Sequence, residues 1–352
     1  MRKITFSVVG LGSRGKDTYL PAIKSFPGDA DIVAVADIDS AKVQAVKEAY
    51  GLAAENCYDS AEALLEAGRL SDVLVIATQD RQHVKQAIAA MRLGYDLILE
   101  KPISPDLKEC VEIEQVAKET KRKVVVCHVL RYTPFYRTLK EILDRDEIGT
   151  AVSINAVENV GYWHQAHSFV RGNWRSSDET SPMILQKSSH DLDLYPWLTG
   201  KRYERVSSFG STFLFRADKA PAGAAKRCLD GCKVKDLCPF DAEKIYVKNE
   251  RTGIEHGHEG WPNNILSMRP TVKNIYEALK TGPYGRCVYY CDNNVVDHQV
   301  ANFSMDDGST MSFTMCAFNS KKSRMAQIMG TKGEIFADMS DNTINCAFWG
   351  RK

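Results

Sequence analysis

The stretch Ile4-Thr5-Phe6-Ser7-Val8-Val9-Gly10-Leu11-Gly12-Ser13-Arg14-Gly15 decides the fold of this chain. Its first six residues form a short apolar run rich in β-branched side chains, which is typical of a buried parallel strand. The glycines follow in the pattern Gly-x-Gly-x-x-Gly, and a segment with helical features begins there. After a strand and before a helix, this pattern indicates a dinucleotide-binding turn.

Each glycine of the turn has its own expected task. Gly10 permits the tight turn, Gly12 lets the backbone approach a pyrophosphate, and Gly15 allows close packing of helix on strand. The start of the helix presents N–H groups to the phosphate. The expected phosphate-side residues are Gly10, Gly12, Ser13, Arg14 and Gly15.

An aspartate follows the next apolar run, residues 32–36. Asp37 lies 22 residues after Gly15, where a carboxylate is expected to accept hydrogen bonds from the adenosine ribose. Its charge would repel a 2′-phosphate, which favours NAD over NADP, whereas the Arg14 guanidinium could serve such a phosphate. An ordinary strand-end or helix-capping aspartate is the alternative interpretation of Asp37.

Strand-like and helix-like segments alternate through the first part of the chain. Further strands are expected at residues 32–36, 73–77, 97–99 and 124–127, and helices at 14–24, 40–50, from 60 onward, 81–93 and 105–120. Pro21 is a candidate kink in the first helix. The alternation predicts an α/β fold, a doubly wound parallel sheet with right-handed crossovers.

The pattern changes after His128, which gives expected domains of 1–128 and 129–352. Helices are expected at 134–143 and 182–198, and strands at 151–160, 300–303 and 310–318, with a turn at 306–308. Residues 219–239 and 249–270 are expected to be long loops, suited to a lid, a metal-bound knob or an oligomer contact. The second domain is therefore expected to be an antiparallel sheet with a few helices.

The composition excludes several classes of partner. A formal net charge of +1 gives no electrostatic reason to expect nucleic acid or an acidic membrane surface. No apolar run approaches the roughly 20 residues of a membrane helix, and the segment before Gly10 is too short for a signal peptide. We therefore expect a cytoplasmic, reduced protein without nucleic-acid or membrane partners.

Glu100-Lys101-Pro102 follows directly on the strand expected at 97–99. This is the carboxyl edge of the sheet, where ligands bind in such folds. A partly desolvated lysine beside the nicotinamide can take or give a proton as hydride moves. The bond before Pro102 is a candidate cis peptide. A solvated lysine beside a turn is the alternative interpretation.

These motifs occur together with Arg131-Tyr132, His190-x-x-Asp193 and Gly330-Thr331-Lys332-Gly333-Glu334. In order and spacing the whole chain resembles the glucose–fructose oxidoreductase / inositol dehydrogenase family (Gfo/Idh/MocA). The resemblance implies a Rossmann domain followed by an α+β domain with a large, mostly antiparallel open sheet. It also implies carbohydrate or cyclitol substrates, and a homo-oligomer, dimer or tetramer, formed through the open sheet face.

The resemblance further implies roles for single residues. Lys101 would contact substrate and cofactor, and His190 would face the reacting hydroxyl. The residues placed on the cofactor side are Thr78, Gln79, His83, Glu100, Lys101, Pro102 and Arg131.

Gln79 stands where an asparagine is common in the family, and the helix of His190 departs from the family pattern at a second position. Dehydrogenases of the family commonly carry an aspartate four residues before the histidine, and this chain has Gln186 there. A glutamine neither accepts a proton nor holds the imidazole in its basic tautomer as an anion would. Either a later carboxylate, Asp191 or Asp193, orients His190, or the lysine of Glu-Lys-Pro is the sole base. A satisfied core histidine is the other interpretation of His190.

Residues 164–175 are rich in aromatic and hydrogen-bonding groups and lack helical or strand periodicity. Sugars bind to aromatic faces and to polar side chains, both of which this segment supplies. A surface loop with packed tryptophans is the alternative. The expected substrate-binding residues are Tyr162, Trp163, His164, Arg171, Trp174, Lys187 and Asp191.

Three cysteines, Cys228, Cys232 and Cys238, lie at short spacing in the loop expected at 219–239. Three thiolates suit a tetrahedral structural zinc site if a fourth ligand arrives from elsewhere. A loop of reduced thiols is the other interpretation. The available fourth donors are His256, His258, Cys287 and Cys291.

Together these features predict hydride transfer between NAD and a secondary hydroxyl of a sugar, glycoside or cyclitol. The alternative is an NAD-dependent glycosidase that works by transient oxidation, elimination and re-reduction, and a third hypothesis is a non-catalytic NAD-binding module. The chain ends at residues 349–352 after a strand-like run, whereas members of the family that it resembles often continue further.

Overall fold

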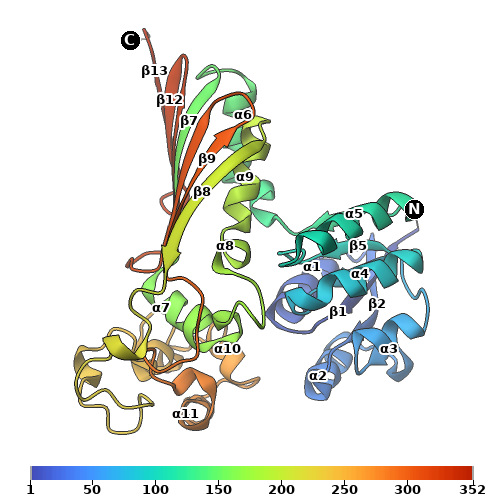
Figure 1. Ribbon diagram of the computed structural model, residues 1–352. Coiled ribbons are helices and arrows are strands. Elements are labelled where there is room, and N and C mark those ends of the chain that lie inside the picture. The colour runs from blue at the N-terminus through green and yellow to red at the C-terminus, as the bar shows by residue number, and fades with distance from the viewer. Residues whose placement is uncertain (1, 351–352) are drawn as a thin grey trace. The chain divides into compact units, whose positions relative to one another are not determined.

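The computed structural model describes residues 2–350 and separates into two compact units, which divide between Cys127 and His128 (Figure 1). Each unit has its own sheet and its own hydrophobic core. None of the helices within residues 2–350 is long and apolar enough to cross a membrane.

The first unit is built on a six-stranded parallel sheet in the order β3-β2-β1-β4-β5-β6. Its strands are β1 (Ile4–Val9), β2 (Ala30–Ala36), β3 (Cys57–Tyr58), β4 (Val73–Ile76), β5 (Asp96–Leu99) and β6 (Val124–Val126). The strand order reverses between β1 and β4, the point at which such sheets bind ligands outside their carboxyl ends. The predicted doubly wound sheet is thus confirmed.

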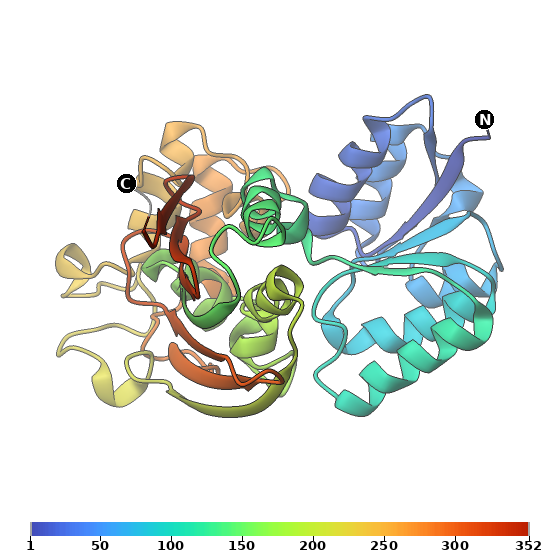
Figure 2. The same ribbon diagram turned by 90° about the horizontal axis from the view of Figure 1, so that it is seen from above.

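Helices cover both faces of this sheet (Figure 2). They are α1 (Leu20–Lys24), α2 (Ser40–Tyr50), α3 (Ala61–Glu66), α4 (His83–Arg92) and α5 (Leu107–Thr120). Because strand side chains alternate between faces, Val8 and Val35 share a core with α1 and α2, whereas Val9 shares one with α3, α4 and α5. Side-chain caps fix three of the starts, since Asp39 accepts from Ala41 N, Ser60 from Ala63 N and Asp106 from Lys108 N.

The first helix differs from the expected single kinked helix. A π-helical turn (Gly15–Tyr19) leads into α1, and Pro21 stands in the first turn of α1. A proline there lacks an N–H that the first turn does not need, so it begins the α-helix instead of breaking it.

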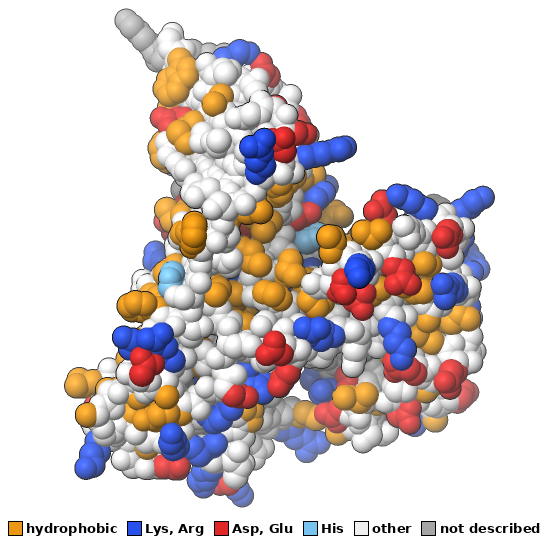
Figure 3. Space-filling view, viewed as in Figure 1, with side chains coloured by type: hydrophobic (Ala, Val, Ile, Leu, Met, Phe, Trp, Pro, Cys, Tyr) orange, Lys and Arg blue, Asp and Glu red, His pale blue; other side chains and the backbone are white. Residues whose placement is uncertain are grey.

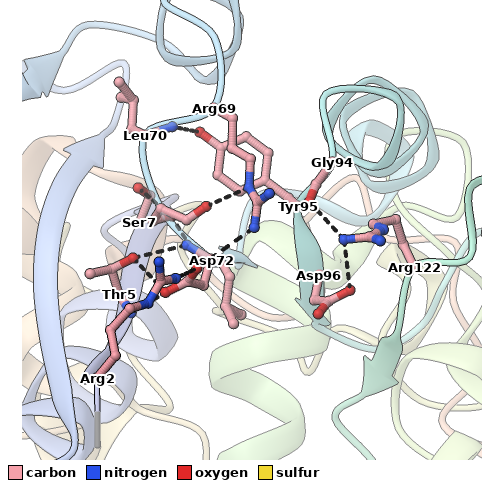
Figure 4. A network of polar contacts seen from close by, with 12 residues as sticks. Arg2, Thr5, Ser7, Arg69, Leu70, Asp72, Gly94, Tyr95, Asp96 and Arg122 are labelled. Atoms are coloured by element: carbon pink, nitrogen blue, oxygen red, sulfur yellow. Dashed lines mark hydrogen bonds and ion pairs between the residues drawn. The ribbon is translucent and has the colours of Figure 1, made fainter.

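A polar network ties together the amino ends of β1, β4 and β5 (Figure 4). Asp72, just before β4, accepts hydrogen bonds from the backbone N and the hydroxyl of Thr5, at 3.0 and 2.9 Å. The Tyr95 hydroxyl accepts from Leu70 N at 2.7 Å and donates to Gly68 O at 2.9 Å. These contacts anchor the edge of the sheet opposite the glycine-rich turn, which leaves the carboxyl edge for a ligand.

The second unit is built on a seven-stranded sheet in the order β13-β12-β11-β7-β10-β9-β8. Only β7 and β10 pair in parallel. The strands are β7 (Ala151–Asn159), β8 (Tyr203–Ser211), β9 (His298–Met305), β10 (Thr310–Cys316), β11 (Ser323–Gly330), β12 (Gly333–Asp338) and β13 (Thr343–Phe348). The mostly antiparallel sheet is therefore confirmed, with the predicted turn between β9 and β10.

Two helices, α6 (Pro134–Asp144) and α9 (Ser189–Thr199), cover one face of this sheet (Figure 1). The opposite face exposes apolar side chains from several strands, among them Phe209, Val300, Met325 and Phe336. Figure 3 shows hydrophobic side chains, in orange, that reach the surface of the second unit. An open apolar face suits the expected contact between copies of the chain, and the homo-oligomer stays a prediction.

Two expectations for the second unit are wrong. The helix expected at 182–198 is two helices, α8 (Met183–Gln186) and α9, because Ser188 adopts φ −93° and ψ 1°, outside the helical region. The segment 164–175, expected without regular structure, continues from α7 (Tyr162–His164) through a π-helical run (Gln165–Arg171) to a short 3₁₀ turn. Every residue of that run is buried, so no amphipathic pattern marks it as helical.

The long loops expected at 219–239 and 249–270 contain only short helical pieces, among them α10 (Asn263–Leu266). They pack with α11 (Val272–Thr281) around a third core that includes Phe240, Tyr246 and Leu279. This core holds the cysteine-rich segment within the second unit.

Candidate active site

The glycine-rich turn has the geometry that its sequence predicts. Gly10 has φ +87°, and a Cβ there would lie 2.5 Å from the carbonyl oxygen of Ala77. A Cβ on Gly15 would lie 1.9 Å from the Gly10 carbonyl oxygen, so only glycine allows the helix to approach the strand this closely. A Cβ on Gly12 would meet no atom within 4 Å. The backbone at Gly12 is therefore open to a ligand, with Ser13 and Arg14 next to it.

Asp37 fastens this turn to the end of β2. Its carboxylate accepts hydrogen bonds from Leu11 N at 2.6 Å and from Asp39 N at 2.8 Å. The N-cap of α2 is Asp39, whose side chain accepts from Ala41 N, so the helix-capping interpretation of Asp37 is wrong. The carboxylate stands at the carboxyl edge of the sheet, beside the turn, as a ribose ligand requires.

Glu100, buried directly after β5, joins the lysine motif to the glycine-rich turn. It accepts hydrogen bonds from Arg14 Nε and from the Tyr19 hydroxyl, both at 2.6 Å. The Arg14 guanidinium is therefore held by a carboxylate, which weakens its case as a partner for a 2′-phosphate. Sequence analysis missed Tyr19, because a tyrosine in the first helix carries no signal of a partner across the sheet.

His83, at the start of α4, braces the two loops that follow β4 and β5. Its Nδ1 lies 2.9 Å from the Pro102 carbonyl oxygen, and its Nε2 lies 3.1 Å from that of Thr78. The Lys101–Pro102 peptide bond is cis. His83 is buried, Gln79 is exposed and Lys101 is half-buried. The histidine thus positions the loop that carries Lys101, and it is too deep to touch a ligand itself.

In the second unit, His190 lies on α9 beside a second histidine. Its ring meets that of His128 edge-on, with centroids 5.9 Å apart. His128 Nδ1 lies 3.9 Å from Asp193 Oδ2, and the same carboxylate accepts from Arg131 Nε at 2.6 Å. Arg131 also lies over the Trp197 ring. Arg131 thus contacts two residues of α9, and it is the ion-pair partner of Asp193.

A buried charge network, defined as Glu158, Lys187, Asp191 and Arg324, joins β7 and β11 to the break between α8 and α9. Glu158 is fully buried, 3.1 Å from Lys187 Nζ and 2.8 Å from Arg324 Nε. Arg324 Nε also lies 2.8 Å from Asp191 Oδ1. Burial lowers the pKa of Lys187, against the raising effect of Glu158. Gln186 is buried at the end of α8.

Sequence analysis missed Glu158 and Arg324. A signal for the first exists, since Ile154, Ala156 and Glu158 occupy alternate positions of β7, on its buried face. A carboxylate in that register has to find a cation. No pattern in the sequence indicates that Arg324 is the partner of Glu158.

Aromatic rings gather around α7. Trp163 and His164 lie with their ring centroids 5.0 and 4.9 Å from that of Trp261, which is 41% exposed. Burial, followed by the charges of Lys187 and Lys322, lowers the pKa of His164 well below 6.5, so its ring is neutral. Trp261 lies in the loop region after residue 249, and its isolated position in the sequence gave no sign of this cluster. The exposed indole offers a sugar an apolar face.

Three other expected substrate residues lie elsewhere or deeper. Tyr162 meets Phe240 edge-on, and Trp174 packs on the core beneath the sheet. Arg171 is fully buried: its Nε donates to the Arg286 carbonyl oxygen, and its Nη2 donates to that of Phe240, each at 2.7 Å. Arg171 therefore supports the backbone of the cysteine-rich segment.

The expected zinc site is not supported. Cys228, Cys232, Cys238 and Cys287 line one small cavity, yet within residues 2–350 no three His, Cys, Asp or Glu side chains are placed to hold a metal ion. The Arg171 guanidinium lines the same cavity and lies 3.5 Å from Cys228 Sγ, so a cation already stands there. Burial also raises the pKa of the Cys287 thiol to about 11, whereas metal ligation needs thiolates.

Two family models match the chain. The one described as "Oxidoreductase family, NAD-binding Rossmann fold" matches residues 4–128, which span the first sheet and its carboxyl-edge motifs. The one described as "GFO/IDH/MocA C-terminal domain" matches residues 136–230.

Individual relatives agree with these models. YteT of Bacillus subtilis, named an oxidoreductase, is 24% identical over 342 residues, which cover 95% of this chain and 76% of that protein. The inositol 2-dehydrogenase of Salmonella typhimurium is 26% identical over 203 residues, 57% of this chain, and the match spans little more than half of that enzyme, 56%.

Among solved structures, the WlbA dehydrogenase from Bordetella pertussis in complex with NADH and UDP-GlcNAcA shares the fold. Its TM-score is 0.70 at 18% identity, over 99% of this chain and 84% of that one. With both domain models matched in the expected order, the chain belongs to the Gfo/Idh/MocA oxidoreductase family, and its first unit is an NAD-binding Rossmann domain.

Proposed function

We propose that the protein transfers a hydride between NAD and a secondary hydroxyl of a sugar, glycoside or cyclitol. One observation carries the proposal: the open turn at Gly12, the Asp37 carboxylate and Lys101 all stand at the carboxyl edge of one parallel sheet. The inositol dehydrogenase among the relatives, and the sugar nucleotide named with WlbA, support a polyhydroxylated substrate.

The residues present fit NAD. The backbone around Gly12, Ser13 and Arg14 would hold the pyrophosphate, and Asp37 the adenosine ribose. Thr78, Gln79 and the Glu100-Lys101-Pro102 loop would border the nicotinamide end. Bound NAD supplies the hydride acceptor for the reaction.

Lys101 and His190 handle the hydroxyl proton in this proposal. A half-buried lysine that follows a buried strand can accept the proton if its charge is partly destabilised. Gln186 cannot relay a proton, and Asp191 and Asp193 each carry an arginine partner. Lys101 is therefore the principal base, and His190 donates to or accepts from the hydroxyl.

Replacing Asp37 by alanine is expected to raise the Kd for NAD by roughly 10- to 100-fold, because charge-assisted hydrogen bonds to the ribose and to Leu11 N are lost. The preference for NAD over NADP should shrink in parallel. Fluorescence titration with both cofactors measures the two effects.

Asp39→Ala is the matched control, because Asp39 stands two residues away, and its side chain caps α2 and lies 3.5 Å from Lys42 Nζ of that helix. It should cost about 1 kcal/mol of stability and leave NAD affinity unchanged. An unchanged Kd for both cofactors in Asp37→Ala would refute the assigned ribose contact.

A substrate screen tests the proposed function. Sugars, glycosides and inositols are offered with NAD while NADH absorbance is followed, and steady NADH formation with at least one of them is expected. Aryl glycosides in the same panel test the alternative: aglycone release without net NADH would identify the glycosidase cycle. Turnover of none, with NAD bound, would leave only a binding module.

A further inference from the structure

When a neighbouring lysine is included, the buried charge network of the second unit has three cations for two carboxylates. Its two carboxylates, Glu158 and Asp191, are engaged by Lys187 and Arg324. A third cation, Lys322, stands two residues before Arg324 and is exposed. Among residues 2–350 its ammonium has no ion-pair or hydrogen-bond partner.

Lys322 lies near Lys187, because the start of β11, which follows it, pairs with the end of β7: Arg324 lies opposite Glu158, whose carboxylate is 3.1 Å from Lys187 Nζ. The charge of Lys187 is the main cause that lowers the pKa of Lys322 to about 8, ahead of burial and of Arg324, while Glu158 opposes the shift. Two ammonium groups that disturb each other this strongly repel, and Glu158 offsets that repulsion only in part. An anion placed against both would relieve the repulsion.

The two lysines border the aromatic cluster of α7. The loop before β11 is fastened to the start of α7, because Gly161 N donates to Asn319 Oδ1 at 2.9 Å. His164, which contacts Trp261, is influenced by the charges of both Lys187 and Lys322. Its buried Nδ1 has no hydrogen-bond partner among the described residues. Three groups thus lie in the same region: the ring face of Trp261, the His164 Nδ1 without a hydrogen-bond partner in the described part of the chain, and the Lys322 ammonium.

We propose that the substrate is an anionic sugar whose carboxylate or phosphate binds at Lys187 and Lys322, with the sugar ring against Trp261. This deepens, and rests on, the proposed oxidoreductase function. Ammonium groups act as point charges and bind either kind of anion, so the charge, and not the planar shape of one acid group, is recognised. A neutral sugar would leave Lys322 unpaired.

The test compares matched ligands on the full chain loaded with NADH. Calorimetry gives Kd values for glucose, glucuronate and glucose 6-phosphate, and for galactose and galacturonate. At about pH 7 we expect an acidic sugar to bind about tenfold more tightly than its neutral counterpart. The two acidic forms of glucose show whether a carboxylate or a phosphate is preferred.

Lys322→Gln should weaken binding of the acidic sugar roughly three- to tenfold and leave the neutral one unchanged. Lys321→Gln is the control, because Lys321 is an exposed neighbour whose charge lies 4.0 Å from Asp341. In the unsubstituted protein the preference should decline from about pH 7 to about pH 9, as Lys322 loses its proton near pH 8. Lys322→Gln should not show that decline.

Equal affinity for acidic and neutral sugars, or an unchanged preference in Lys322→Gln, overturns the inference. Turnover of neutral sugars with NAD in that case leaves the proposed function standing. If no sugar of either kind binds or is oxidised, the proposed function itself falls, and the inference with it.

Discussion

Lys101→Ala is expected to lower kcat about 10²- to 10⁴-fold, the range over which a positioned acid–base group accelerates proton transfer. Its loop is held by the His83 brace and by the buried Glu100, neither of which the substitution removes. The Kd for NAD should therefore stay within about threefold, because the glycine-rich turn and Asp37 are intact. Stopped-flow measurement of NADH formation, with fluorescence titration of NAD, separates the two quantities.

Lys101→Arg distinguishes proton transfer from simple charge. A guanidinium keeps the positive charge but does not lose its proton in proteins, so it should rescue little activity. Lys108→Ala, an exposed lysine on α5 of the same unit, should behave like the unsubstituted protein. A loss of less than about tenfold in Lys101→Ala, or near-full activity in Lys101→Arg, would remove the lysine from its assigned role.

Glu158→Gln should reduce the free energy of unfolding by about 3–5 kcal/mol, because it leaves Lys187 and Arg324 with one buried carboxylate between them. Urea unfolding followed by circular dichroism measures the change. Glu204→Gln, at an exposed position of β8, should stay within about 0.5 kcal/mol.

A double substitution sharpens this test. Glu158→Gln combined with Lys187→Met removes a cation together with the anion, so it should recover part of the lost stability. A double variant that is less stable than Glu158→Gln alone would show that packing, and not charge, sets the effect at this site.

The first sheet and its cofactor edge were predictable from sequence because their signals are local. Gly10, Gly15 and Asp37 lie in one strand–turn–helix–strand unit, and the tasks expected of both glycines appear in the close contacts of Gly15 and the left-handed φ of Gly10. The apolar runs of β1 and β2 needed no knowledge of distant residues. Local patterns of this kind survive folding, because tertiary contacts only reinforce them.

The second unit was less predictable because its features depend on distant contacts. The break after Gln186 occurs where Lys187 meets Glu158, a strand residue from far earlier in the chain. The helical run before Gly172 is buried all round, which erases its periodicity. The zinc hypothesis rested on the spacing of the cysteines. The fold also places the Arg171 guanidinium against Cys228, and the cysteine spacing carries no information about that cation.

The hydrogen bond between Arg14 and Glu100 joins the glycine-rich turn to the loop that carries Lys101. The Glu100 carboxylate accepts hydrogen bonds from Arg14 and Tyr19, at the start of the helix that follows the glycine-rich turn. Glu100 directly precedes Lys101. A shift of that helix would therefore act on the backbone that carries the lysine. The turn expected to hold the phosphates and the residue before Lys101 thus share one set of hydrogen bonds.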